Sequence, residues 1–162
     1  MSRDQPDRSV EYTIRDAGPG DADAIAEMTL RLIPDRAVGR DISAFHDYFS
    51  RPKDDIHPGT RTVVACDAGG NPVGYLMVRP DTEFFSGEAR AYIERLATTA
   101  EAEGMGAGRQ LMAWAAAWAR SEGFRTIALD VFANNARARR FYGRNGYEED
   151  FLQMVRTLGD ED

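Results

Sequence analysis

The sequence has one cysteine, Cys66, and two histidines in 162 residues. One cysteine forms neither an internal disulfide nor a cysteine-based zinc site, and its scarcity favours a reducing cytoplasm. His46 and His57 stand 11 positions apart, which is a poor spacing for a zinc site. We therefore expect a cytoplasmic protein without a metal.

Long apolar runs and lysine are also scarce. The longest apolar run, residues 111–119, falls well short of the roughly 20 residues of a membrane helix. The first ten residues are polar, so we expect no signal peptide. Lys53 is the only lysine, and its polar surroundings argue against a lysine nucleophile. The net charge of −7 disfavours nucleic acid and anionic lipid as partners.

The chain has the composition of one globular domain, with 43% hydrophobic and 29% charged residues. We expect a disordered tail over 1–9, a domain over 10–158 and an acidic tail over 159–162. Alternation predicts strands at 10–16 and 89–98, and the turn Gly69-Gly70-Asn71 predicts a hairpin of strands 61–68 and 72–78. We also expect a strand at 126–132 and one or two more in 147–158. Helical spacing and capping residues predict helices at 22–33, 42–49, 109–122 and 136–144, with Asp21 as the N-cap of the first and Asn134 or Asn135 as the N-cap of the last.

This order is an α/β mixture with a hairpin meander in residues 61–98. The meander breaks the strict alternation of a doubly wound fold, which excludes that class. We expect a mixed sheet of about six or seven strands with about four helices.

A glycine-rich turn precedes the longest predicted helix. Gly104, Gly106 and Gly108 allow a ligand close to the backbone, and a helix start offers unpaired N–H donors. These features suit a pyrophosphate, although a flexible strand-to-helix turn would have the same composition. Neither a P-loop nor a dinucleotide fingerprint fits, because the lysine and the third glycine are missing.

Two spaced motifs resemble the GCN5-related N-acetyltransferase (GNAT) superfamily, and the resemblance covers roughly residues 10–157. The first comprises the strand end Leu96-Ala97-Thr98, the turn 103–108 and the apolar pair Leu111-Met112. The second comprises Asn135, Ala138, Tyr142 and Gly146-Tyr147. Glu103 departs from the pattern, which usually has Gln or Arg there. A carboxylate next to a pyrophosphate is unfavourable unless it turns to solvent or Arg109 compensates.

The resemblance implies a GNAT fold that binds acetyl-CoA between two splayed strands. It places the pantetheine on the backbone of the strand end and Asn135, and the thioester sulfur near Tyr142 as the proton donor. Tyr142 also fits a plain core position. The implied cofactor residues are Leu96, Ala97, Thr98, Gly104, Met105, Gly106, Ala107, Gly108, Arg109, Asn135 and Tyr142.

Two carboxylates are candidates for the general base. Glu94 precedes Leu96 by two residues, so strand alternation places both on one face. Asp130 matches the glutamate position of ribosomal-protein N-terminal acetyltransferases. Each also fits a structural, arginine-paired carboxylate, and a chain of waters would make either unnecessary.

The resemblance implies direct transfer of an acetyl group to a primary amine, with a small molecule favoured over a protein N-terminus. It also allows a homodimer, an acyl-CoA-binding module with little turnover, or a structural domain. Trp114 and Trp118 are expected in the core or a dimer contact. The arginines of the last predicted helix, Arg137, Arg139, Arg140 and Arg144, are expected to form a solvated face, and the alternative is contact of Arg137 or Arg140 with the CoA 3′-phosphate. The carboxylates expected to attract an amine are Asp35, Asp41, Asp47, Asp54, Asp55, Asp81, Glu83 and Asp150.

Overall fold

The computed structural model describes residues 10–32, 41, 43–44, 47 and 57–159. The predicted tail over 1–9, most of the predicted helix 42–49 and much of the loop after it lie outside these residues. Within the described part of the chain, no helix has the length and apolarity needed to cross a membrane.

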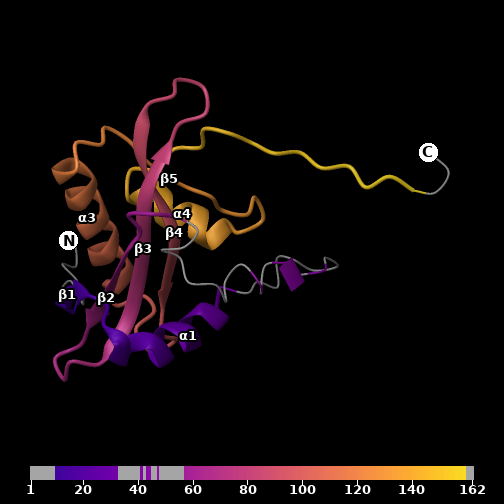
Figure 1. The fold of residues 1–162 in the computed structure, drawn as a ribbon. Helices are drawn as coiled ribbons and strands as arrows, with labels where there is room; N and C mark the ends of the chain where they lie inside the picture. Colours follow the sequence, from indigo (N-terminus) through magenta and orange to yellow (C-terminus); the bar gives the residue numbers. More distant parts are fainter. Residues whose placement is uncertain (1–9, 33–40, 42, 45–46, 48–56, 160–162) are drawn as a thin grey trace, which may run out of the picture.

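Five strands form one mixed sheet in the order β1-β2-β3-β4-β5 (Figure 1). The strands are β1 (Thr13–Asp16), β2 (Arg61–Cys66), β3 (Pro72–Thr82), β4 (Ala89–Thr98) and β5 (Ile127–Leu129). The first four pair antiparallel in sequence, whereas β4 and β5 are parallel. The α/β class and mixed sheet are therefore confirmed, with fewer strands than expected.

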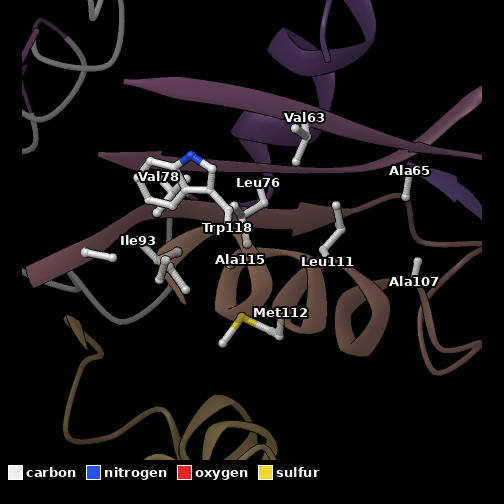
Figure 2. Packing of buried hydrophobic residues seen from close by; sticks show 12 residues of the cluster. Val63, Ala65, Leu76, Val78, Ile93, Ala107, Leu111, Met112, Ala115 and Trp118 are labelled. Carbon is white, nitrogen blue, oxygen red and sulfur yellow. The ribbon is translucent and has the colours of Figure 1, made fainter. Parts of the chain in front are cut away.

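Among the described residues, α1 (Ala22–Leu30) and α3 (Ala107–Ser121) pack on the sheet, and α4 (Ala136–Arg144) packs against the first turn of α3. The larger core cluster lies between the sheet and α3 and includes Leu76, Ile93, Leu111 and Trp118 (Figure 2). A smaller cluster, including Met28 and Tyr75, lies on the α1 side. Trp118 is therefore a core residue, and Trp114 stacks on it at 6.5 Å between ring centroids.

The helix ends follow their sequence signals, with one exception. Gly123 ends α3 with a φ of 83°, and Asn135 caps α4 by accepting a hydrogen bond from the Ala138 N–H at 3.1 Å. Asp21 precedes α1 but makes no side-chain cap. Its carboxylate accepts hydrogen bonds from Arg15 and the Gly18 N–H instead, because the short 3₁₀ turn at Pro19–Asp21 brings those donors closer.

The C-terminal prediction is wrong. Residues 147–159 form no strand in the structure. Tyr147 packs against Tyr142 of α4, and the end of the segment extends away from the sheet and α4 (Figure 1). A strand needs a neighbour to satisfy its backbone, and this segment makes no ladder with β5.

Candidate active site

β4 and β5 separate part of the way along β4. Their parallel pairing runs from Ala91 with Ile127 to Ile93 with Leu129, and then β5 ends. β4 continues to Thr98 and stays paired with β3 on its other side. The backbone of residues 94–98 therefore has no β5 partner among the described residues, and we call this separation of β4 from the end of β5 the opening.

A β-bulge lies where the strands separate. On the β3 side, Met77 pairs with Arg95 and Val78 pairs with Ile93, which leaves Glu94 as the extra residue. Leu96 packs against the α3-side cluster, to which Val78 of β3 also belongs. Arg79 follows Val78 on β3 and therefore points to the other face, and Glu94 contacts Arg79 there. Glu94 and Leu96 therefore lie on opposite faces, and the prediction of a shared face is wrong because a bulge interrupts strand alternation.

Glu94 belongs to a polar cluster on the α1 side of the sheet. Its carboxylate is only 9% exposed and accepts a hydrogen bond from Arg79 Nε at 2.5 Å, while His57 Nε2 lies 3.6 Å away. The Arg79 guanidinium also lies over the Tyr92 ring, 4.6 Å from its centroid. Glu94 is therefore a charge held in place by a cation rather than an isolated carboxylate.

Asp130 follows β5 and reaches across to β4. Its Oδ2 accepts a hydrogen bond from the Tyr92 hydroxyl at 2.7 Å. Burial raises the pKa of Tyr92, and the hydrogen bond to Asp130 raises it further, so the phenol keeps its proton at neutral pH. Tyr92 thus joins the two candidate bases, through its hydroxyl to Asp130 and through Arg79 to Glu94.

The glycine turn presents backbone donors. Gly104 and Gly106 adopt φ values of 76° and 98°, which the glycine pattern accommodates without strain. Among the described residues, no backbone acceptor meets the N–H groups of Gly104, Gly106, Ala107 or Gly108. A run of N–H groups at a helix start is the donor set that a pyrophosphate requires, so these residues fit CoA.

Gly108 has a second role, which is packing. A Cβ at this position would meet the Phe141 ring of α4 at 3.2 Å. The close approach brings α4 against the first turn of α3. It therefore places Tyr142, the next residue of α4, near the predicted phosphate turn.

Glu103 lies between two arginines. Its Oε2 is 3.1 Å from Arg31 Nη2, and its Oε1 pairs with Arg137 Nη1. Arg31 also donates a hydrogen bond to the Thr98 carbonyl, which is one of the groups predicted to face the pantetheine. The Glu103 carboxylate is therefore bound by cations from α4 and from the residue after α1, and Arg109 makes no pair with it.

Tyr142 packs between Phe141 and Tyr147, with ring centroids 5.4 and 6.0 Å away. Burial raises its pKa above the usual value for tyrosine. Among the described residues nothing hydrogen-bonds its hydroxyl, so the proton is free to go to a ligand. The packing role is therefore confirmed, and the acid role stays a prediction that a protonated, unpaired hydroxyl is compatible with.

The structure adds residues that the sequence reasoning missed, chiefly Arg31 and Arg79. Arg79 pairs with Tyr92 in the β3–β4 register, so an explicit hairpin alignment would have found it. No sequence signal links Arg31 to Glu103, 72 positions later. Asn135 caps α4, and Arg109 lies on α3 near Tyr147, beside a groove rather than at Glu103.

The acidic residues expected to attract an amine are partly used within the fold. Although partial burial opposes it, hydrogen bonds from Arg90 and Arg79 lower the pKa of Asp81. Hydrogen bonds from Phe85 and Ser86 lower the pKa of Glu83 to about 2. Both carboxylates therefore shape the β3–β4 loop. Asp35, Asp54 and Asp55 lie outside the described residues, and among those described, no three His, Cys, Asp or Glu side chains form a metal-binding group.

Comparisons with known proteins agree with this geometry. Residues 27–147 match the model of the acetyltransferase (GNAT) family. An aminoglycoside N(6′)-acetyltransferase type 1 from Stenotrophomonas maltophilia is 30% identical over 141 residues, which cover 85% of this chain and 86% of that protein.

Two solved structures show similar folds. A transcriptional regulator from Bacillus halodurans has a TM-score of 0.69 and 27% identity, covering 91% of this chain and all of that one. An aminoglycoside antibiotic 6′-N-acetyltransferase from Acinetobacter baumannii has a TM-score of 0.67 and covers 92% of this chain and all of its own. At 14% identity, the second shows the fold alone.

Proposed function

We propose that this chain, which belongs to the acetyltransferase (GNAT) family, transfers an acetyl group from acetyl-CoA to the amino group of a small molecule. The family match shows an N-acetyltransferase; the donor and the acceptor class are our proposal. The observation that carries it is the separation of β4 from β5, with N–H donors at one end of the opening and two carboxylates near the other.

The chain offers three sets of groups to acetyl-CoA, which supplies the acetyl thioester when bound. The N–H groups of the glycine turn suit the pyrophosphate. The backbone at Leu96 and Thr98 suits the amides of the pantetheine, once Arg31 leaves the Thr98 carbonyl. Arg31 and Arg137 suit the phosphates when they exchange Glu103 for a phosphate group.

Tyr142 is proposed as the general acid. Direct attack of an amine on a thioester expels a thiolate, which must receive a proton. Burial raises the pKa of Tyr142, so its hydroxyl is protonated at neutral pH and has a proton to donate. Its place on α4, next to the residue that contacts Gly108, puts it beside the turn that is proposed to hold the donor.

The amine must lose a proton, and one of two carboxylates is proposed to accept it. Glu94 is the more buried, and its contact with Arg79 keeps it oriented. Asp130 lies at the end of β5, oriented by the Tyr92 hydroxyl. Variants Glu94→Gln and Asp130→Asn separate them, because only loss of the base removes the acidic limb of the pH profile of kcat/KM.

The small-molecule acceptor is supported by the relative from Stenotrophomonas maltophilia, which is named for aminoglycoside 6′-acetylation. The net charge of −7 favours the approach of a polycation. We therefore propose aminoglycosides or similarly polycationic amines as acceptors.

A matched pair of acceptors tests this proposal. Thiol release from acetyl-CoA is measured with an aminoglycoside that carries a 6′-amino group and with its 6′-hydroxyl analogue. We expect release that depends on the 6′-amine, and a product heavier by one acetyl group. A polyamine and a peptide with a free N-terminus complete the panel. Turnover of the peptide alone would contradict a small-molecule acceptor.

One observation favours a second candidate, an acyl-CoA-binding module with little turnover. Glu103 engages both arginines that the proposed phosphate site would use. Tight binding of acetyl-CoA without thiol release, across the whole acceptor panel, would select that function instead.

A further inference from the structure

The polar cluster around Glu94 contains a histidine that the proposed function does not use. His57 Nε2 lies 3.6 Å from Glu94 Oε1, and the two side chains are 31% and 9% exposed. Histidine is the side chain that most readily gains and loses a proton near neutral pH. The cluster therefore places a buried carboxylate beside a more exposed group that can carry a proton.

The turn that carries His57 is held against the sheet. The N–H and the hydroxyl of Thr60 donate hydrogen bonds to the His57 carbonyl at 3.3 and 2.6 Å. Gly59 has a φ of 83°, and a Cβ there would meet the ring of Pro80 in β3 at 3.3 Å. Pro80 directly follows Arg79 on that strand. The backbone of His57 is therefore fixed next to the polar cluster.

The neighbours of Glu94 differ in what they can do with a proton. Arg79 Nε donates to Glu94 Oε1 at 2.5 Å, but a guanidinium has no site that accepts a proton. Burial and the hydrogen bond to Asp130 raise the pKa of Tyr92, so its phenol keeps its proton. An imidazole is a stronger base than a carboxylate, so a proton received by Glu94 can pass on to His57.

Acetyl transfer to an ammonium group releases one proton to water. The nitrogen of a primary ammonium carries three hydrogens, and the nitrogen of the amide product carries one. As the C–N bond forms and the C–S bond breaks, one of the two protons ends on the sulfur, where Tyr142 is the proposed donor. The other must reach water in every turnover, and the Glu94 carboxylate has little contact with water at 9% exposure.

We infer that His57 is a positioning residue that acts through Glu94, taking the proton that Glu94 removes from the amine and releasing it to water. The inference rests on the proposed acetyl transfer. The O–H bond on Glu94 breaks as an N–H bond forms at His57 Nε2, and the imidazolium then gives the proton to water. The contact of 3.6 Å must shorten for this step, as such contacts commonly do when substrate binds. Asp130 is exposed and would need no such relay.

Steady-state kinetics in weak buffer at neutral pH test the relay with His57→Gln and His57→Ala. Glutamine still donates a hydrogen bond to Glu94 but carries no proton, so a merely structural role would survive this change. We expect both variants to lose about 10- to 100-fold in kcat, with little change in the Kd for acetyl-CoA. Added imidazole should restore much of the kcat of His57→Ala. It should not restore Glu94→Gln, because that variant lacks the first proton acceptor.

NMR of the ligand-free protein supplies a readout that does not depend on turnover. The chain has two histidines, His46 and His57, so His57→Ala identifies the ring resonances of each. Glu94→Gln should move the ring resonances of His57, whereas Asp130→Asn should leave them in place. Circular dichroism verifies that each variant is folded.

Three results would overturn the relay and leave the proposed function intact. The first is a His57→Gln variant as active as the parent, and the second is a His57→Ala variant that imidazole does not restore. The third is a Glu94→Gln variant in which the His57 resonances do not move. A parent protein that acetylates none of the acceptors would instead overturn the proposed function and the relay together.

Discussion

Replacing Glu103 by glutamine should tighten the binding of acetyl-CoA and destabilise the protein. Arg31 and Arg137 both pair with this carboxylate, and Arg31 also holds the Thr98 carbonyl. In the proposed complex these arginines turn to the phosphates, so the two ion pairs must first break. Glutamine keeps the size of the side chain and removes the charge that holds them.

The exposure of the three side chains sets the expected size of both effects, the gain in affinity and the loss of stability. The Arg31, Glu103 and Arg137 side chains are 39%, 33% and 67% exposed, so each pair is a surface ion pair. Such pairs contribute roughly 0.2–1 kcal/mol each, or about 0.4–2 kcal/mol together. At about 1.4 kcal/mol per tenfold, the Kd for acetyl-CoA should fall about 2- to 30-fold. The same loss should lower the Tm by about 1–8 °C in a chain of this size.

Isothermal titration with acetyl-CoA and thermal unfolding measure the two effects on one sample. Glu101→Gln is the matched control, because Glu101 is exposed on the same turn and makes no ion pair among the described residues. The gain in affinity should also shrink at high salt, which screens the pairs. The reasoning is refuted if Glu103→Gln binds no tighter than the parent, or if Glu101→Gln gives an equal gain.

Three further predictions concern the acid, the helix contact and the Arg15–Asp21 cluster. Tyr142→Phe should lower kcat by about 10²-fold with little change in the Kd for acetyl-CoA, because it removes the proposed proton donor. The control Tyr147→Phe should lower kcat much less. Equal losses of kcat in the two variants, measured by steady-state kinetics, would contradict the acid role. Gly108→Ala in α3 should lower the free energy of unfolding by about 1–3 kcal/mol, because its Cβ would crowd the Phe141 ring of α4. The control Gly143→Ala in α4 places its Cβ in open space, so denaturant melts should show it to be neutral or stabilising. Hydrogen bonds from Arg15 and Gly18 lower the pKa of Asp21 to about 2. The stabilisation from these bonds is therefore present above the unfolded pKa near 3.9 and is lost as the pH falls through 2. Asp21→Asn should lower the free energy of unfolding by about 1–3 kcal/mol at pH 7, and its melting curve should converge with that of the parent near pH 2.

Local sequence signals predicted several elements well. β4 spans residues 89–98 as expected, because apolar and polar residues alternate along it. α4 spans residues 136–144 as expected, because Asn135 caps its start. The glycine turn also behaves as its composition suggested, with positive φ at Gly104 and Gly106. These features depend on neighbours in the sequence, which a single sequence shows.

Features that depend on distant pairing were not predictable. The bulge at Glu94 arises from the register between β3 and β4, and it reverses the face assigned to that residue. The contacts of Glu103 join residues 31, 103 and 137, which no local pattern connects. Residues 147–158 carry large apolar residues, which favour a strand, but they pair with no strand of the described sheet, because pairing requires a partner as well as a pattern.

The central claim is that the opening between β4 and β5 binds acetyl-CoA for transfer to an amine. A titration of the parent protein with acetyl-CoA, followed by addition of the 6′-amino aminoglycoside to the same cell, tests it most directly. The account predicts saturable binding with one site per chain, and then a second heat from turnover that the 6′-hydroxyl analogue does not produce. No binding at millimolar acetyl-CoA would contradict it.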